Sequence, residues 1–76
     1  MKDKYFVEYM ELGLAVSYFR KVRGMTQQQL ADKMDVNYEM ISRIENANTG
    51  ISADVLFELS KALNVPLGEL FSHAKL

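Results

Sequence analysis

The sequence predicts one compact all-α domain of four to five helices. Three observations support this fold class. Apolar residues recur at helical spacing along nearly the whole chain, polar helix caps precede three of the apolar runs, and one interhelical link is very short. With 76 residues, 49% of them hydrophobic, the chain can bury a single core and is too short for two domains. No alternating pattern of the kind that predicts strands persists.

The first helix is expected over about 9–23, ending before Gly24, a natural C-terminal stop. Its apolar side chains step by three and four residues and are Tyr9, Leu12, Val16 and Phe19. Tyr5 and Phe6 are able to continue this helix backward. We therefore treat residues 1–10 as an N-terminal extension that is part of the first helix or packs on it.

The next three helices share one type of start, a polar cap between apolar residues placed to form a hydrophobic staple. The caps are Thr26, Asn37 and Ser52. After Thr26, Gln29 stands at the position that completes a capping box. The predicted helices run over 27–34, about 38–46 and about 53–63.

A short fifth helix, about 67–72, is expected after Pro66. These elements divide the chain into the extension, a helical domain over 11–72 and a C-terminal tail over 73–76.

The link between the second and third helices is the most informative feature. Met34 closes one helix and Asn37 caps the next, so Asp35 and Val36 alone form the bend. Such a short link makes two helices cross steeply, as in the helix-turn-helix that places a recognition helix in the major groove of DNA. One bend residue needs a left-handed backbone, which Asp tolerates better than most residues.

Composition excludes several classes of protein. Cysteine is absent and His73 is the only histidine, so we expect no disulfide, no metal site and no cofactor. No nucleophile motif or converging carboxylate pair is present, so no catalysis is expected. Since no apolar run approaches the length of a membrane span, we expect a soluble cytoplasmic protein.

The charge distribution is uneven. The formal net charge is -1, which by itself is unusual for a DNA-binding domain. However, residues 20–43 hold five basic and three acidic side chains, whereas residues 44–76 hold two basic and four acidic ones. This layout fits one face toward phosphate and another toward solvent or a partner.

From about Leu12 to Phe71 the chain resembles the Cro and lambda-type repressor helix-turn-helix family, the XRE family. The residues that carry the resemblance are Met25-Thr26-Gln27-Gln28-Gln29-Leu30-Ala31, Val36-Asn37, Ile41-Ser42-Arg43-Ile44-Glu45 and Leu63-Asn64-Val65-Pro66-Leu67-Gly68-Glu69-Leu70-Phe71. The resemblance implies a lambda-repressor-like fold with the helix-turn-helix at helices 2 and 3. It also implies a transcriptional regulator, acting as a homodimer on a pseudopalindromic DNA operator.

Site residues are carried over by position. The resemblance implies DNA base readout by Asn37, Tyr38, Glu39 and Arg43. It implies phosphate contacts from Gln27, Ser42, Asn48 and Thr49, although the loop that holds the last two lacks the basic residues common in relatives. Arg20 and Glu45 match a structural ion pair between the first and third helices, and Leu67 and Phe71 match dimer contacts.

Two alternatives remain open from the sequence. Arg43 is four residues from Glu39 on the same helix face, so the two side chains can also form an ordinary surface ion pair. The whole domain can also serve as a protein-interaction or dimerisation module with little affinity for DNA, because this fold does not fix a function.

Overall fold

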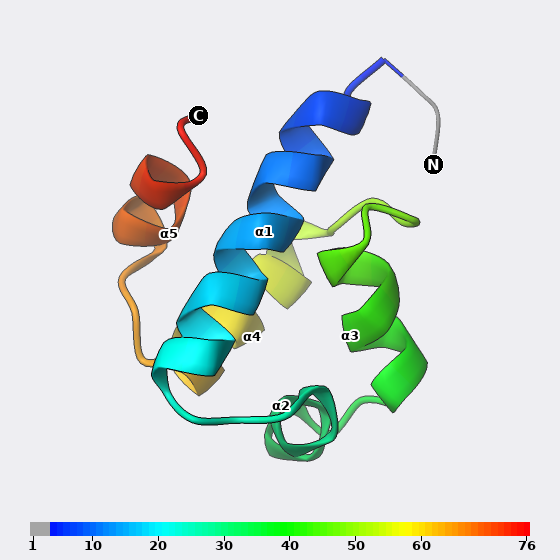
Figure 1. Ribbon diagram of the computed structural model, residues 1–76, viewed down its shortest axis with the longest axis vertical. Coiled ribbons are helices and arrows are strands. Elements are labelled where there is room, and N and C mark those ends of the chain that lie inside the picture. The colour runs from blue at the N-terminus through cyan, green and yellow to red at the C-terminus, as the bar shows by residue number, and fades with distance from the viewer. Residues whose placement is uncertain (1–3) are drawn as a thin grey trace.

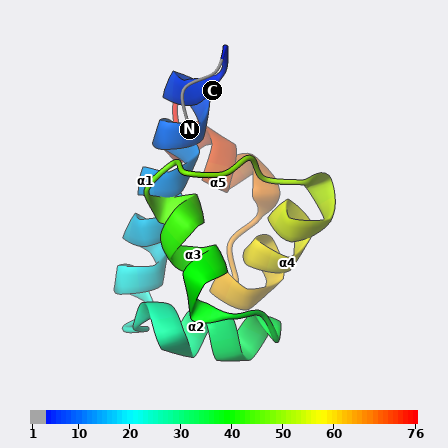
Figure 2. The same cartoon turned by 90° about the vertical axis from the view of Figure 1, so that its right-hand side faces the viewer.

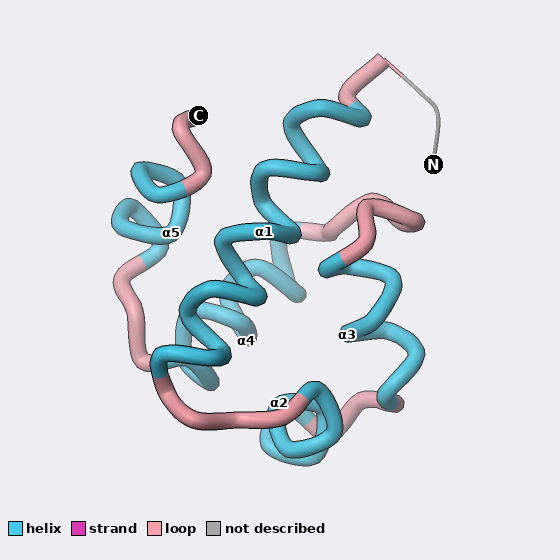
Figure 3. The backbone as a smooth tube through the Cα atoms, in the orientation of Figure 1, coloured by secondary structure: helices cyan, strands magenta, loops and turns pink. Residues whose placement is uncertain are grey.

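The computed structural model describes residues 4–76, and within them the chain forms helices only. These are α1 (Phe6–Val22), α2 (Gln27–Met34), α3 (Tyr38–Glu45), α4 (Ala53–Leu63) and α5 (Leu67–His73). α1 lies between α3 and α5, with α4 behind it and α2 below (Figure 1). The same arrangement is clear in the backbone trace (Figure 3). The expected all-α fold is confirmed.

The core takes side chains from every helix. The largest fully buried ones are Val16, Leu30, Ile41, Ile44, Leu59, Leu63 and Leu70. Within α3 and α4 the buried pairs are three or four residues apart, so each helix turns one apolar stripe inward. Burial of these stripes supplies the main favourable term in folding.

The three predicted helix starts are confirmed. Thr26 and Gln29 form a reciprocal capping box, with each side chain bonded to the other's backbone N–H at 3.0 and 2.8 Å. The Asn37 side chain accepts from the backbone N–H of Met40, and Ser52 acts in the same way at the start of α4. Each cap satisfies a backbone donor that has no partner within its own helix.

Some helix ends differ from the prediction. α1 begins at Phe6 rather than at residue 9, because the backbone bond from the Tyr9 N–H to the Tyr5 carbonyl is already helical. α3 ends one residue early, at Glu45, because Ala47 adopts a left-handed backbone with φ of 57°.

The expected C-terminal tail also packs against the domain. α5 continues to His73, whose ring stacks on Tyr18 with 4.2 Å between centroids, and Ala74 is buried. Residues 1–3 of the expected N-terminal extension lie outside the described residues.

The bend between α2 and α3 has the geometry that its sequence predicts. Asp35 lies in the left-handed region, with φ of 57° and ψ of 44°, and the Val36 N–H bonds to the Ala31 carbonyl. Figure 1 shows α2 almost end-on while α3 runs along the plane of the picture, so the two helices cross steeply.

Gly13 allows α1 to approach the C-terminal end of α3. A β-carbon at this position would clash with the backbone carbonyl of Ile44 and would lie 2.9 Å from that of Glu45. Glycine inside a helix usually weakens it, but here the close approach of two helices requires it.

None of the helices in the described part of the chain is long and apolar enough to cross a membrane.

Candidate nucleic-acid interface

One side of α3 is uncovered by the rest of the protein. Figure 2 looks onto this side, and no other helix lies in front of α3. The exposed side chains on α3 and its cap include all four residues expected to read bases, which are Asn37, Tyr38, Glu39 and Arg43. Ile41 and Ile44 point the opposite way into the core. The structure therefore gathers these four residues on the solvent face of one short helix.

Arg43 and Glu39 form an ion pair along this face. Their closest atoms, Nη2 of Arg43 and Oε2 of Glu39, are 3.6 Å apart, and both side chains are more than 60% exposed. Ion pairs this exposed contribute little to stability and break easily. The pair therefore leaves the Arg43 guanidinium available to an incoming partner.

The residues expected to meet phosphates gather near the C-terminal half of α3. Gln27, the first residue of α2, is half-buried and reaches Glu45 at the end of α3. Ser42 is half-buried and is contacted by the Asn46 amide. Asn48 is exposed and Thr49 is half-buried in the loop that follows.

The structure brings Arg20 and Glu45 together. Nε and Nη2 of Arg20 donate to the two carboxylate oxygens of Glu45 at 2.6 and 3.0 Å, and both side chains are at least 90% buried. Arg20 also donates through Nη1 to the Met25 carbonyl at 2.8 Å. The hydrogen bond to Glu45 raises the pKa of Arg20 against the opposing effect of burial. Arg20 is thus charged and bonds both Glu45 at the end of α3 and Met25 in the α1–α2 turn.

Gln27 is also part of this network, which sequence reasoning missed. Its Nε2 donates to Oε1 of Glu45 at 2.9 Å. The two residues are far apart in the chain, so no local pattern signals the bond. One signal was available. The expected Arg20–Glu45 pair places Glu45 near the end of α1, and α2 begins a few residues later.

Two of the arginines counted in the basic segment serve the fold instead of a phosphate face. Arg20 is buried, and Arg23 donates to the carbonyls of Leu63 and Asn64 at 2.7 and 2.9 Å, where it caps the C-terminal end of α4. Fewer of the basic residues in segment 20–43 are therefore available to phosphate than the charge count suggests. Lys21, Arg23, Lys33 and Arg43 are the exposed bases of this segment, and the guanidinium of Arg23 is bonded to the end of α4.

The two residues expected at a dimer contact are partly exposed. Leu67 and Phe71 are half-buried and pack against the core. The more exposed large apolar side chains include three along the outer face of α1: Val7, Leu14 and Val22.

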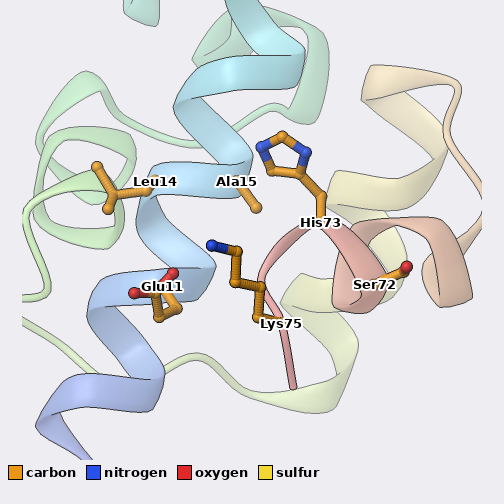
Figure 4. Close-up of a pocket in the computed structure, with 6 residues that line it drawn as sticks. All are labelled: Glu11, Leu14, Ala15, Ser72, His73 and Lys75. Carbon is orange, nitrogen blue, oxygen red and sulfur yellow. The ribbon is translucent and has the colours of Figure 1, made fainter.

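A hollow of about 510 Å³ lies between α1 and the C-terminal residues (Figure 4). Glu11 and Lys75 line one end and His73 the other. The hollow is open to solvent, and within residues 4–76 no three His, Cys, Asp or Glu side chains group as metal ligands would. It shares no lining residue with the surface around α3.

The profile of the family described as Helix-turn-helix matches residues 16–70, a span that contains α2, the bend and α3. The chain belongs to the XRE family of helix-turn-helix proteins. The matched span includes α3, on whose uncovered face base readout is expected.

Proteins of similar sequence match most of this chain. The competence pilus inhibition repressor of Acinetobacter baylyi is 44% identical over 62 residues, which cover 82% of this chain and 56% of the relative. An uncharacterized HTH-type transcriptional regulator of Sinorhizobium medicae is 26% identical, covering 86% of this chain and 47% of that protein. The chain thus spans about half the length of these relatives.

Solved structures show the same fold. The clp gene regulator ClgR from Corynebacterium glutamicum has a TM-score of 0.86 at 25% identity, covering 90% of this chain and 88% of that one. The restriction-modification controller protein C.AhdI from Aeromonas hydrophila has a TM-score of 0.85 at 20% identity, covering 91% and 100%.

Proposed function

We propose that this protein binds double-stranded DNA sequence-specifically and regulates transcription, as a repressor or autoregulator. The observation that carries the proposal is the uncovered polar face of α3, held by a short bend at a steep angle to α2. A helix presented in this way fits the major groove, where base edges carry a distinguishable pattern of donors and acceptors. Relatives named as a repressor and as transcriptional regulators support the same function.

In this proposal the exposed face of α3 reads bases through Asn37, Tyr38, Glu39 and Arg43. Arg43 is placed for guanine, whose O6 and N7 accept from a guanidinium fork, and Glu39 is placed to accept from cytosine N4. Gln27, Ser42, Asn48 and Thr49 bind phosphate oxygens through neutral groups. Their position around the C-terminal half of α3 supports this division of roles.

We also propose that two copies act together on a pseudopalindromic operator. A single α3 touches few base pairs, so two copies are needed to specify a site. Paired recognition helices enter successive major grooves about 34 Å apart. A regulator of this kind works in the compartment that contains the DNA, which favours the cytoplasm.

The test is selection of bound duplexes from a random DNA pool at moderate salt, followed by sequencing. We expect an enriched inverted repeat with half-site centres about one helical turn apart. A variant with Tyr38→Ala and Arg43→Ala, whose exposed side chains lie away from the core, is the matched control and should enrich nothing. If the unaltered protein also enriches nothing at low salt, the domain is a protein-interaction module instead.

The dimer needs a separate measurement. Sedimentation of the unaltered protein should show a concentration-dependent dimer, and Leu67→Ser with Phe71→Ser should shift it toward monomer while circular dichroism confirms folding. Leu14→Ser on the outer face of α1 is the comparison. Dissociation by Leu14→Ser alone would move the contact from α5 to α1, and a strict monomer at high concentration would contradict the homodimer.

A further inference from the structure

We propose that Glu45 is a positioning residue for DNA binding, which holds the Gln27 amide in the orientation that meets a phosphate. The inference rests on the proposed function and assigns Glu45 a role beyond a structural ion pair. It starts from the hydrogen bond between Nε2 of Gln27 and Oε1 of Glu45, 2.9 Å long.

The hydrogen bond to Glu45 occupies only one of the donors of the Gln27 amide. A primary amide carries two N–H donors and one carbonyl acceptor. In the free protein Glu45 takes one donor, so the second N–H of Gln27 remains for a phosphate oxygen. Because Gln27 is half-buried and already tethered, it loses less rotamer freedom on binding than a free glutamine side chain would.

The charge of the Glu45 carboxylate is balanced by Arg20. A carboxylate next to a phosphate would repel it. Both oxygens of Glu45 accept from the guanidinium of Arg20, at 2.6 and 3.0 Å, so the pair is neutral as a unit. Arg20 therefore allows Glu45 to hold Gln27 beside a polyanion at little electrostatic cost.

The network of Arg20, Gln27 and Glu45 joins three helices. Arg20 lies on α1, Gln27 begins α2 and Glu45 ends α3, and Arg20 also bonds the Met25 carbonyl just before α2. The same few atoms thus fix the phosphate-binding end of α2 against the helix that reads bases. A shift of either helix would break a buried charge-assisted bond.

The alternative is that Glu45 only stabilises the fold. The two roles differ in whether the effect of Gln27 on DNA binding depends on Glu45. A double-mutant cycle measures this dependence directly.

The cycle uses fluorescence anisotropy with the selected operator duplex. The second background is Arg20→Met with Glu45→Leu, since replacing both members of a buried ion pair with apolar residues usually preserves stability. We expect Gln27→Ala to weaken DNA binding about tenfold in the unaltered protein, as for loss of a bond to a charged group. In the second background we expect the same substitution to weaken binding no more than about twofold.

Arg43→Ala is the matched control, because Arg43 lies outside the network. It should weaken binding by the same factor in both backgrounds. Equal effects of Gln27→Ala in the two backgrounds would overturn the positioning role while leaving the proposed function intact. Failure of the unaltered protein to bind any duplex would instead reject the proposed function.

A second measurement covers the case in which the altered background does not fold. In the NMR spectrum of the free protein, the side-chain amide of Gln27 should exchange with water more slowly than that of Gln29, whose side-chain oxygen accepts from the Thr26 N–H. Equal exchange of the two amides would show that Glu45 does not hold Gln27, and the proposal would be wrong.

Discussion

The exposed Arg43 side chain has two roles. It forms an ion pair with Glu39, and it is proposed to read a base. The pair at 3.6 Å is present in the free protein, as expected for charges four residues apart on a helix. Because both side chains are largely exposed, the bond adds little to stability. Removal of Arg43 is therefore a nearly pure probe of binding.

We predict that Arg43→Ala weakens binding to the selected operator by about 1–3 kcal/mol and relaxes preference at one base pair. The free energy of unfolding should change by less than about 0.5 kcal/mol. Competition assays with operators altered one base pair at a time would measure the first effect, and urea unfolding the second. Equal weakening on every sequence would make Arg43 a phosphate contact.

The effect of Gly13 on stability depends on the neighbouring helix α3. Helix propensity alone predicts that Gly13→Ala stabilises α1 by about 1 kcal/mol. We predict the opposite sign, a loss of about 1–3 kcal/mol, because the new methyl group meets backbone carbonyls that cannot rotate away.

Urea unfolding monitored by circular dichroism tests this sign. Gly68→Ala on α5 is the matched control, since a β-carbon there meets nothing within 4 Å. The control should be neutral or slightly stabilising. An increase in stability for Gly13→Ala would mean that α1 and α3 pack less closely than described.

At the scale of an element, α3 depends on its cap for both its stability and its proposed contact. The Oδ1 of Asn37 accepts from the Met40 N–H at 2.9 Å, so its amide nitrogen remains for a base or a phosphate. The cap and the contact therefore use different atoms of the same side chain, and substitutions can separate them.

We predict that Asn37→Ser keeps the cap and most of the stability but weakens DNA binding. Asn37→Ala should lose both, with about 1 kcal/mol of stability removed. Ser52→Ala removes a comparable cap from α4 and should lower stability without changing DNA affinity at temperatures where the variant is folded. If Asn37→Ser bound like the unaltered protein, Asn37 would be a cap only.

At the scale of the molecule, the charge available to DNA is smaller than the sequence implies. Arg20 and Arg23 form hydrogen bonds within the protein. The residues expected to bind phosphate are neutral, and these are Gln27, Ser42, Asn48 and Thr49. Neutral contacts release no condensed counterions, so binding should depend weakly on salt.

We predict that the slope of log K against log salt concentration has a magnitude below about 5 for the dimer. Thr49→Lys should steepen it by about 0.9 for each monomer, because one more phosphate is neutralised on each half-site. Anisotropy titrations between low and moderate salt would measure both slopes. An unchanged slope would place Thr49 away from the DNA backbone.

The fold was largely predictable because its signals are local. Thr26, Asn37 and Ser52 each satisfy a backbone donor three residues ahead, and Asp35 adopts the left-handed bend that a short link requires. The helix ends were less predictable. α5 runs on to His73, whose ring stacks on Tyr18 of α1, a contact between residues far apart in the chain.

Local signals predict the helices and the bend between α2 and α3, since hydrogen bonds and steric limits within a few residues set both. Helical periodicity predicts which side chains lie on the outer face of α3. Three contacts depend on how the helices pack: Glu45 with Arg20 and Gln27, Arg23 with the end of α4, and Gly13 with α3. These contacts join residues that are distant in the chain, and their partners are known only once the helices have packed.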